Sequence, residues 1–285
     1  MSDTPNFLQS EYPPSDPHGA LFHVFPVPLE RTVSYGRGTA HGPIAILNAS
    51  SQLEAYDGIS FPGEAGIYTA PPIDCSGEPQ AILGRIEEIV RPAFQQNKVP
   101  VLLGGEHTLT QAAVRAARSV KDDVGVVQFD AHADLRNVYE GSPLSHACVM
   151  RRIAEQDIPI FQIGVRSICQ EEIDYRDAKG IRFLDAVDLQ RKPVPEQILP
   201  DDFPGNIYLT FDVDGLDSSL MPATGTPEPG GLFWWQALTL VASVVRSGRK
   251  VIGLDVVELA PIAGMHAPDY LAAKLTYALM GFAGR

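Results

Sequence analysis

Residues 124–134 read VGVVQFDAHAD, an apolar run that ends in three polar side chains at alternate positions. The first six residues, Val124–Phe129, show no polar alternation, which is typical of a strand buried on both faces of a parallel sheet. Alternate residues of an extended chain point to the same side. Asp130, His132 and Asp134 can therefore converge on one point just beyond this strand.

Similar apolar runs recur along the chain and alternate with segments of helical periodicity. We expect the other strands at Leu21–Val27, Lys98–Gly104, Ile158–Val165, Asn206–Phe211 and Lys250–Val257. We expect helices over 78–97, 108–120, 145–156, 231–247 and 268–282, with Pro92 bending or dividing the first. This alternation predicts an α/β fold in which helices cover both faces of a mostly parallel sheet.

Polar side chains follow four of the predicted strands directly. Besides the segment that begins at Asp130, they are Glu106 and His107 in one loop, Asp212 and Asp214 in another, and Glu258 in a third. Ligands of open α/β sheets bind beyond the carboxyl ends of the strands. We therefore expect these four loops to form one site.

Six of these side chains have the chemistry and spacing of metal ligands: His107, Asp130, His132, Asp134, Asp212 and Asp214. Four carboxylates packed together without cations would repel one another, and their pKa values would rise. Divalent cations remove that cost, and six ligands with bridging carboxylates suit two metals roughly 3.5–4 Å apart. No cysteine belongs to the set, so the ligands favour Mn²⁺, with Fe²⁺, Co²⁺ or Zn²⁺ as alternatives. A purely structural metal or a salt-bridged cluster is the competing interpretation.

The composition narrows the classes of partner and compartment. The 285 residues include 22 Lys and Arg against 35 Asp and Glu, a net charge of −13, which disfavours binding to nucleic acid. No apolar run approaches the ~18 residues of a membrane span, and the acidic, proline-containing N-terminus does not resemble a signal peptide. Cys75, Cys148 and Cys169 are widely spaced, which fits a reducing compartment. We expect a soluble, cytoplasmic protein without a membrane or nucleic-acid partner.

Six blocks of the sequence resemble the ureohydrolase family of arginases and agmatinases. They are GGEHT (104–108), VVQFDAHAD (126–134), SHA (145–147), TFDVDGLD (210–217), TGTPEPGG (224–231) and LDVVELAP (254–261). Their order and spacing match from about residue 34 to the C-terminus. SYGRGTAHGP (34–43), EGSPLSHACVMRR (140–152) and TGTPEPGG are most similar to bacterial agmatinases. Ser218 and Ala223 depart from the usual loop residues, and neither carries chemistry.

The resemblance implies a three-layer α/β/α arginase-like fold with a mostly parallel, roughly eight-stranded central sheet. It also implies two Mn²⁺ ions per chain and a homotrimer or homohexamer. By the family pattern, one manganese would be held by His107, Asp130, Asp134 and Asp212, and the other by Asp130, His132, Asp212 and Asp214. Asp130 and Asp212 would bridge the two ions.

The chain shows no linker, internal repeat or low-complexity segment. We therefore expect one ureohydrolase catalytic domain over residues 21–285. Residues 1–20 contain four prolines and little that is apolar, so we expect them to form a loosely ordered N-terminal arm.

Guanidinium hydrolysis assigns roles to further residues. A guanidinium carbon is a poor electrophile, and a metal lowers the pKa of bound water from 15.7 toward about 7, so that hydroxide is available. We expect Asp134 to orient this nucleophile, and His146 to contact the substrate and carry a proton to the leaving amine. Glu258 is the candidate anchor, since a carboxylate can bind guanidinium bidentately. The roles of Asp255 and Glu106 stay open: each could orient the site or simply accept hydrogen bonds from nearby donors.

The loop 135–143, LRNVYEGSP, differs from the arginase pattern that holds the α-amino and α-carboxylate groups of arginine. We therefore expect agmatine as the substrate, with putrescine and urea as products, a step of polyamine biosynthesis. Arg37 and Arg136 could instead face a carboxylate, as in 4-guanidinobutanoate or 3-guanidinopropanoate. Arginine hydrolysis and formiminoglutamase chemistry stay open. A silent metal- or ligand-binding relative and the one-zinc deacetylase branch of the fold are further alternatives.

Overall fold

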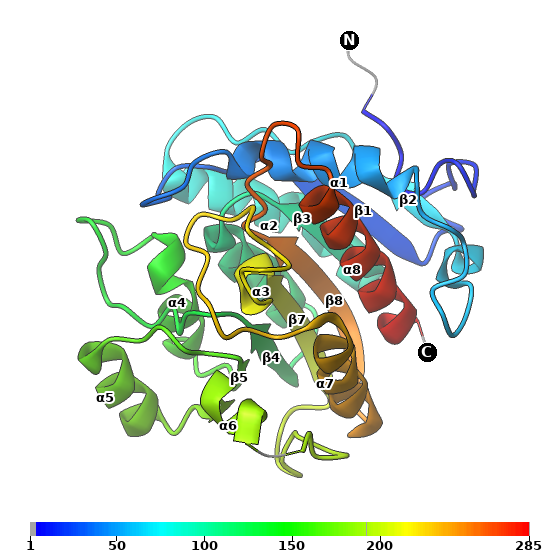
Figure 1. The fold of residues 1–285 in the computed structure, drawn as a ribbon. Coiled ribbons are helices and arrows are strands. Elements are labelled where there is room, and N and C mark those ends of the chain that lie inside the picture. The colour runs from blue at the N-terminus through cyan, green and yellow to red at the C-terminus, as the bar shows by residue number, and fades with distance from the viewer. Residues whose placement is uncertain (1–3, 192, 285) are drawn as a thin grey trace.

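The computed structural model describes residues 4–191 and 193–284, and these form one sheet between two layers of helices (Figure 1). Its eight described strands are β1 (Phe22–Val27), β2 (Ile67–Thr69), β3 (Val99–Gly104), β4 (Val124–Phe129), β5 (Ile160–Ile163), β6 (Arg182–Leu184), β7 (Asn206–Asp212) and β8 (Lys250–Val257). Neighbouring strands pair in parallel in the order β2-β1-β3-β8-β7-β4-β5-β6. The predicted parallel α/β sheet is confirmed.

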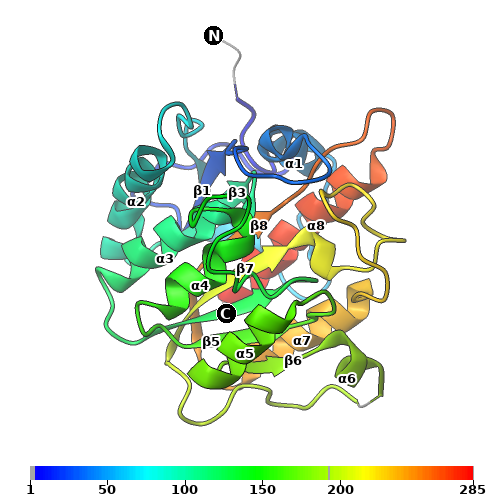
Figure 2. The same cartoon turned by 90° about the vertical axis from the view of Figure 1, so that its left-hand side faces the viewer.

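Helices cover both faces of the sheet (Figure 2). On one face lie α2 (Pro79–Gln95), α3 (Thr110–Arg118), α4 (Val149–Ala154) and α5 (Gln170–Lys179). On the other face lie α1 (Gly42–Ser50), α6 (Ala186–Arg191), α7 (Trp234–Arg246) and α8 (Ala267–Ala283). The three-layer α/β/α architecture is therefore present.

The central strands are buried on both faces, as their unbroken apolar runs predict. In β4, Val126 packs in the core on the side of α2 and α3, while Val127 packs in the core on the side of α7 and α8. Across the β4–β7 pair, the rings of Phe129 and Phe211 stack with centroids 4.9 Å apart. This two-sided packing holds the carboxyl ends of the central strands in place.

Pro92 lies inside α2, which runs over 17 residues without a break, so the expected division of this helix is wrong. A proline removes one backbone hydrogen bond, that to the carbonyl four residues earlier. Both Pro92 and the residue at that position, Glu88, are exposed, so water can satisfy the carbonyl.

The N-terminal segment is attached to the core. Phe7 and Leu8 are 2% and 0% exposed and pack in the same core as α1 and α8. Their backbone N–H groups donate to Thr69 Oγ1 and Ser50 Oγ, each at 2.9 Å. The expectation of a loosely ordered arm over 1–20 does not hold for these two residues, because their apolar side chains are buried; residues 1–3 lie outside the described part.

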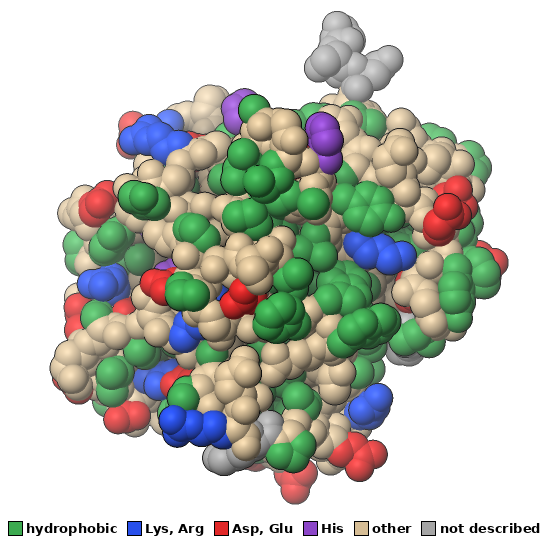
Figure 3. Space-filling view, viewed as in Figure 1, with side chains coloured by type: hydrophobic (Ala, Val, Ile, Leu, Met, Phe, Trp, Pro, Cys, Tyr) green, Lys and Arg blue, Asp and Glu red, His purple; other side chains and the backbone are tan. Residues whose placement is uncertain are grey.

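None of the helices in the described part of the chain combines the length and apolarity that crossing a membrane requires. On the face shown in Figure 3, acidic and basic side chains are interspersed with hydrophobic ones. No single sign of charge dominates this face.

Candidate metal centre and active site

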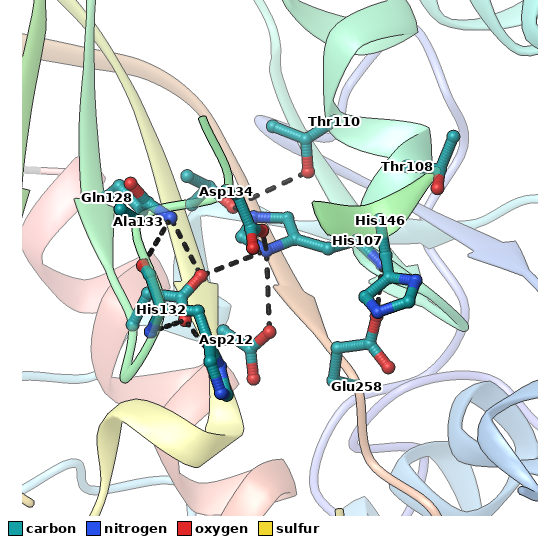
Figure 4. A network of polar contacts seen from close by, with 12 residues as sticks. His107, Thr108, Thr110, Gln128, His132, Ala133, Asp134, His146, Asp212 and Glu258 are labelled. Carbon is teal, nitrogen blue, oxygen red and sulfur yellow. Dashed lines mark hydrogen bonds and ion pairs between the residues drawn. The ribbon is translucent and has the colours of Figure 1, made fainter. Parts of the chain in front are cut away.

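The four loops that were predicted to form one site follow four neighbouring strands in the middle of the sheet, β3, β8, β7 and β4. His107, Asp130 and Asp212 each place a ligand atom within 4.8 Å of the others, and Asp130, His132 and Asp214 do the same. Asp134 joins the first group, with its Oδ2 atom 3.1 Å from His107 Nδ1 (Figure 4). The structure thus brings together all six residues, with Asp130 common to both groups.

The ring of His107 is oriented by a buried chain of polar groups. Its Nε2 atom lies 2.8 Å from Thr210 Oγ1, and the Thr210 hydroxyl donates to Asp255 Oδ1 at 2.6 Å. Because that hydroxyl has one proton, Thr210 accepts from Nε2–H, which leaves Nδ1 to face the carboxylates. The other oxygen of Asp255 accepts from Thr110 and Tyr208 at 2.8 and 2.9 Å. The role of Asp255, left open by the sequence, is to hold this chain.

The environment of His107 Nδ1 fits a metal ion. This atom is buried and has no hydrogen-bond partner among the described residues. Oxygens of Asp130, Asp134 and Asp212 lie 3.1, 3.1 and 3.4 Å from it. A lone pair that faces three carboxylates is repelled unless a proton or a cation lies between them. The set of imidazole nitrogen and carboxylate oxygens suits a divalent transition metal.

Backbone and amide groups hold the carboxylates in place. Asp130 accepts from Gln128 Nε2 at 2.8 Å and from the backbone N–H of His132 at 2.6 Å. Asp214 accepts from the backbone N–H of Ala131 at 3.0 Å, and its own N–H donates to Asp212 at 2.9 Å. These bonds fix where the carboxylates point.

Burial and the neighbouring charges shift the pKa values in this cluster. Burial and the neighbouring Asp130 raise the pKa of Asp134 to about 7. Burial, together with Asp214 and Asp130, also raises the pKa of Asp212. Burial lowers the pKa of His132, but Asp214 and Asp130 outweigh it and raise the pKa to about 12. Cations that bind these groups must therefore displace protons.

Two adjoining cavities give access to the cluster. The inner cavity, of about 20 Å³, is lined by five of the six predicted ligands and by His146 and Glu258. The outer cavity, of about 320 Å³, is lined by residues that include Arg136, Tyr139 and Glu228. The two share the lining residues Ser34, His132, Asp134, His146 and Thr226. A molecule in the outer cavity can therefore extend toward the predicted ligands.

The model of the arginase family matches residues 20–281. The chain belongs to the arginase family. It is 41% identical over 288 residues to the N(1)-aminopropylagmatine ureohydrolase of Synechocystis sp., covering 98% of this chain and 94% of that relative. It is 32% identical over 281 residues to the agmatinase of Pyrococcus horikoshii, covering 96% of each. The solved agmatine ureohydrolase of Thermoplasma volcanium superposes with a TM-score of 0.83 at 32% identity, covering 93% of this chain and 90% of that one.

These matches confirm the family that the six sequence blocks indicated, and the chain is a hydrolase of the arginase family with an arginase-like fold. Members of this family depend on two metal ions, and the two ligand groups around Asp130 agree with that requirement.

In this arginase-family site, the predicted catalytic residues Asp134, His146 and Glu258 line the same inner cavity (Figure 4). Glu258 is 7% exposed, and its Oε1 atom accepts from the backbone N–H of His107 at 2.6 Å. His146 Nδ1 lies 3.2 Å from the Thr32 hydroxyl and 3.4 Å from that of Ser145. Burial lowers the pKa of His146.

Glu106, Arg136 and Arg37, whose roles the sequence did not decide, lie in different parts of the structure. The carboxylate of Glu106 binds the backbone N–H groups of Arg31 and Thr32, each at 2.6 Å, and holds this segment beside the site. Arg136 lines the outer cavity, whereas Arg37 is exposed and is not among the described residues that line either cavity.

Sequence reasoning missed two hydroxyl groups, those of Thr32 and Thr210. Thr210 left a weak trace, because it is a hydroxyl inside the apolar run NIYLTF, where a buried polar group needs a partner. Thr32 lies outside the recognised blocks, so the sequence held nothing that marked it.

Proposed function

We propose that the chain binds two Mn²⁺ ions and hydrolyses the guanidinium group of a small cationic amine, releasing urea. The convergence of two imidazole–carboxylate groups on Asp130 carries this proposal. One ion would be held by His107, Asp130, Asp134 and Asp212, and the other by Asp130, His132, Asp212 and Asp214. When bound, the two ions supply a water-derived nucleophile at neutral pH.

The chain's own residues bind the substrate and move the proton. Oε1 of Glu258 is engaged by His107, and Oε2, which has no described hydrogen-bond partner, is available to the guanidinium. The hydroxyls of Thr32 and Ser145 contact Nδ1 of His146, so Nε2 is the atom that would give a proton to the leaving amine. The C–N bond breaks only with that proton, because an amide-like anion is a poor leaving group.

Agmatine is the substrate that we propose, with putrescine and urea as products. A dication suits a protein with a net charge of −13. It also suits the outer cavity, where the carboxylate of Glu228 has no described ion-pair partner. The loop 135–143 that contributes Arg136 and Tyr139 to this cavity differs from the arginase pattern, which argues against arginine.

A second candidate substrate is N(1)-aminopropylagmatine. The relative that shares 41% identity over 98% of this chain is named for that substrate. The outer cavity, of about 320 Å³, offers space beyond the inner cavity for a longer polyamine tail. The additional ammonium group of this substrate would again meet Glu228.

A panel of guanidino substrates tests the function. We expect the Mn²⁺-loaded enzyme to release urea from agmatine or N(1)-aminopropylagmatine with a kcat/KM at least about tenfold above that for arginine or 4-guanidinobutanoate, since a carboxylate that lacks a partner is costly to remove from water. A preference for 4-guanidinobutanoate would show that Arg136 binds a carboxylate and would overturn the choice of substrate. Absence of urea from every substrate, or well below two Mn²⁺ per active chain, would overturn the binuclear hydrolase.

A further inference from the structure

The carboxylate of Glu106 holds the segment that contains Arg31 and Thr32 beside the active site. This side chain is fully buried, although it follows β3 and precedes a predicted metal ligand. Its Oε2 atom accepts from the backbone N–H groups of Arg31 and Thr32, each at 2.6 Å, and its Oε1 atom accepts from the Thr32 hydroxyl at 3.1 Å. Three hydrogen bonds to one carboxylate hold Thr32 firmly, because bonds to an ionised acceptor are short and strong.

Thr32 in turn contacts His146 at two points. Its Oγ1 atom accepts from the backbone N–H of His146 at 3.1 Å and lies 3.2 Å from the ring atom Nδ1. A hydroxyl has a single proton. When that proton goes to Glu106, Oγ1 is an acceptor for Nδ1–H, and the free position of the ring is Nε2. His146 lines the inner cavity, and no described residue forms a hydrogen bond with Nε2.

We infer that Glu106 and Thr32 form a positioning relay that keeps the His146 ring with Nδ1–H toward Thr32 and Nε2 toward the substrate. This relay rests on the proposed function. Without it the ring can turn about its last torsion, which is broad, and exchange the two nitrogens. Thr32 and Glu106 act through His146 and do not touch the reacting atoms, so they are positioning residues.

The relay determines that Nε2 of His146 is the ring atom that transfers the proton. As the bond between the guanidinium carbon and the leaving nitrogen breaks, its electron pair stays on that nitrogen and takes the proton from Nε2. Nε2 of the neutral ring first takes that proton from the attacking water, so His146 is an imidazolium only between attack and bond breaking, and it then returns to a neutral imidazole that keeps its Nδ1 proton on Thr32. The amine therefore leaves neutral, the positive charge passes to the carbon fragment, and loss of the O–H proton from that fragment gives urea.

Kinetic constants distinguish this positioning role of Thr32 from a merely structural one. Ser34 and Tyr35, which line the inner cavity, follow Thr32 closely in the chain. If Thr32 only held this segment, its loss would disturb the cavity wall and raise KM. If Thr32 orients His146, its loss should lower kcat, and only in a protein that still contains His146.

The experiment compares Thr32→Val, Thr32→Ser and the Thr32→Val, His146→Asn double variant in the Mn²⁺-loaded enzyme. We expect Thr32→Val to lower kcat by about 10–100-fold with KM and metal content unchanged, and Thr32→Ser to stay within about threefold of the wild type. In the His146→Asn background, Thr32→Val should cause no further loss beyond about twofold, because coupled residues are not additive. Thr239→Val, an exposed threonine on α7, is the matched control.

A second readout does not depend on activity. The ring ¹⁵N shifts of His146 in the enzyme loaded with diamagnetic Zn²⁺, assigned with His146→Asn, should show the Nδ1–H tautomer in the wild type at pH 8 and its loss in Thr32→Val. An Nε2–H tautomer in the wild type, independent losses in the double variant, or a Thr32→Ser enzyme as slow as Thr32→Val would overturn the relay. A wild type that shows the Nδ1–H tautomer and releases no urea would overturn the proposed function and leave the relay standing.

Discussion

The carboxylate of Glu258 accepts a 2.6 Å hydrogen bond from the backbone N–H of His107. Glu258 directly follows β8, and His107 is the first residue of the short 3-10 helix (His107–Leu109) after β3. This hydrogen bond therefore joins the predicted substrate anchor to a predicted metal ligand across two neighbouring strands. Glu258 adopts a φ of 66°, an uncommon conformation for a residue other than glycine, which such contacts must stabilise.

Replacing Glu258 by Gln should weaken substrate binding without removing metal. The amide oxygen can still accept from His107, but the variant loses the charge that attracts the guanidinium. A hydrogen bond to a charged group contributes about 1.5–3 kcal/mol, so we expect kcat/KM to fall by about 10–150-fold. Steady-state kinetics and metal analysis check this, and an unchanged kcat/KM with full metal content would remove Glu258 as the anchor.

Replacing Asp255 by Asn should loosen the metal bound through His107. The substitution weakens the acceptor that orients Thr210, and residues behind a ligand typically contribute 10–100-fold to metal affinity. We expect a Kd for Mn²⁺ raised by about that factor, with activity restored at saturating Mn²⁺. Competition with a chelator measures the Kd, and the exposed Asp122 provides Asp122→Asn as the control. Equal affinity in both variants would contradict this role.

Metal binding should tighten as the pH rises from 6 to 8. Asp134, whose pKa is raised to about 7, is mostly protonated at pH 6, and His132, whose pKa is raised to about 12, holds a proton at both values. Each must lose its proton to ligate a cation, so low pH opposes binding. Titration calorimetry in buffers of different ionisation enthalpy should show protons released on binding Mn²⁺. Uptake of protons, or none exchanged, would contradict the shifted pKa values.

Replacing His146 by Asn should remove the proton donor and keep the metal centre. We expect turnover to fall by roughly 10²–10⁴-fold with the Mn²⁺ content unchanged, since general acid catalysis contributes a factor of this size. His266→Asn, at an exposed histidine before α8, controls for the loss of an imidazole. Similar activity in the two variants would exclude His146 from the reaction.

Replacing Phe7 by Ala should destabilise the protein even though the residue lies near the N-terminus. Its side chain is 2% exposed and packs with its ring centroid 6.4 Å from that of Tyr277. Truncating a buried phenylalanine costs about 3–5 kcal/mol, which is an upper limit where a terminal segment can detach alone. Urea denaturation measures the change, and Phe233→Ala, at a residue that is 53% exposed, should cost far less. Equal urea midpoints for the two variants would show that burial of Phe7 does not contribute to the stability of the protein.

Much of the fold could be predicted because the central strands carry long apolar runs. The predicted strand over 250–257 coincides with β8, and the run 124–129 coincides with β4. The three-residue edge strands β2 and β6 escaped prediction, since three residues are too few to show a period. Phe7 and Leu8 escaped because the prolines and polar residues around them hid two buried side chains.

The candidate ligands could be predicted because their side chains alternate directly after strands. What surrounds them could not, since the role of a hydroxyl depends on what it faces in space. Thr210 lies 103 residues from His107 along the chain, and Thr32 lies 114 residues from His146. The left-handed backbone of Asp134, with a φ of 54°, is uncommon for a residue other than glycine and was likewise not predicted.

The strand order has a consequence for how the centre is made. β3 and β4, which follow each other in the sequence and precede the loops of His107 and Asp130, are separated in the sheet by β7 and β8, the last two strands of the chain. A nascent chain leaving the ribosome therefore lacks the two strands that set the spacing between these loops until it is nearly complete. The proposed metal site can therefore be completed only after β7 and β8 have been synthesised.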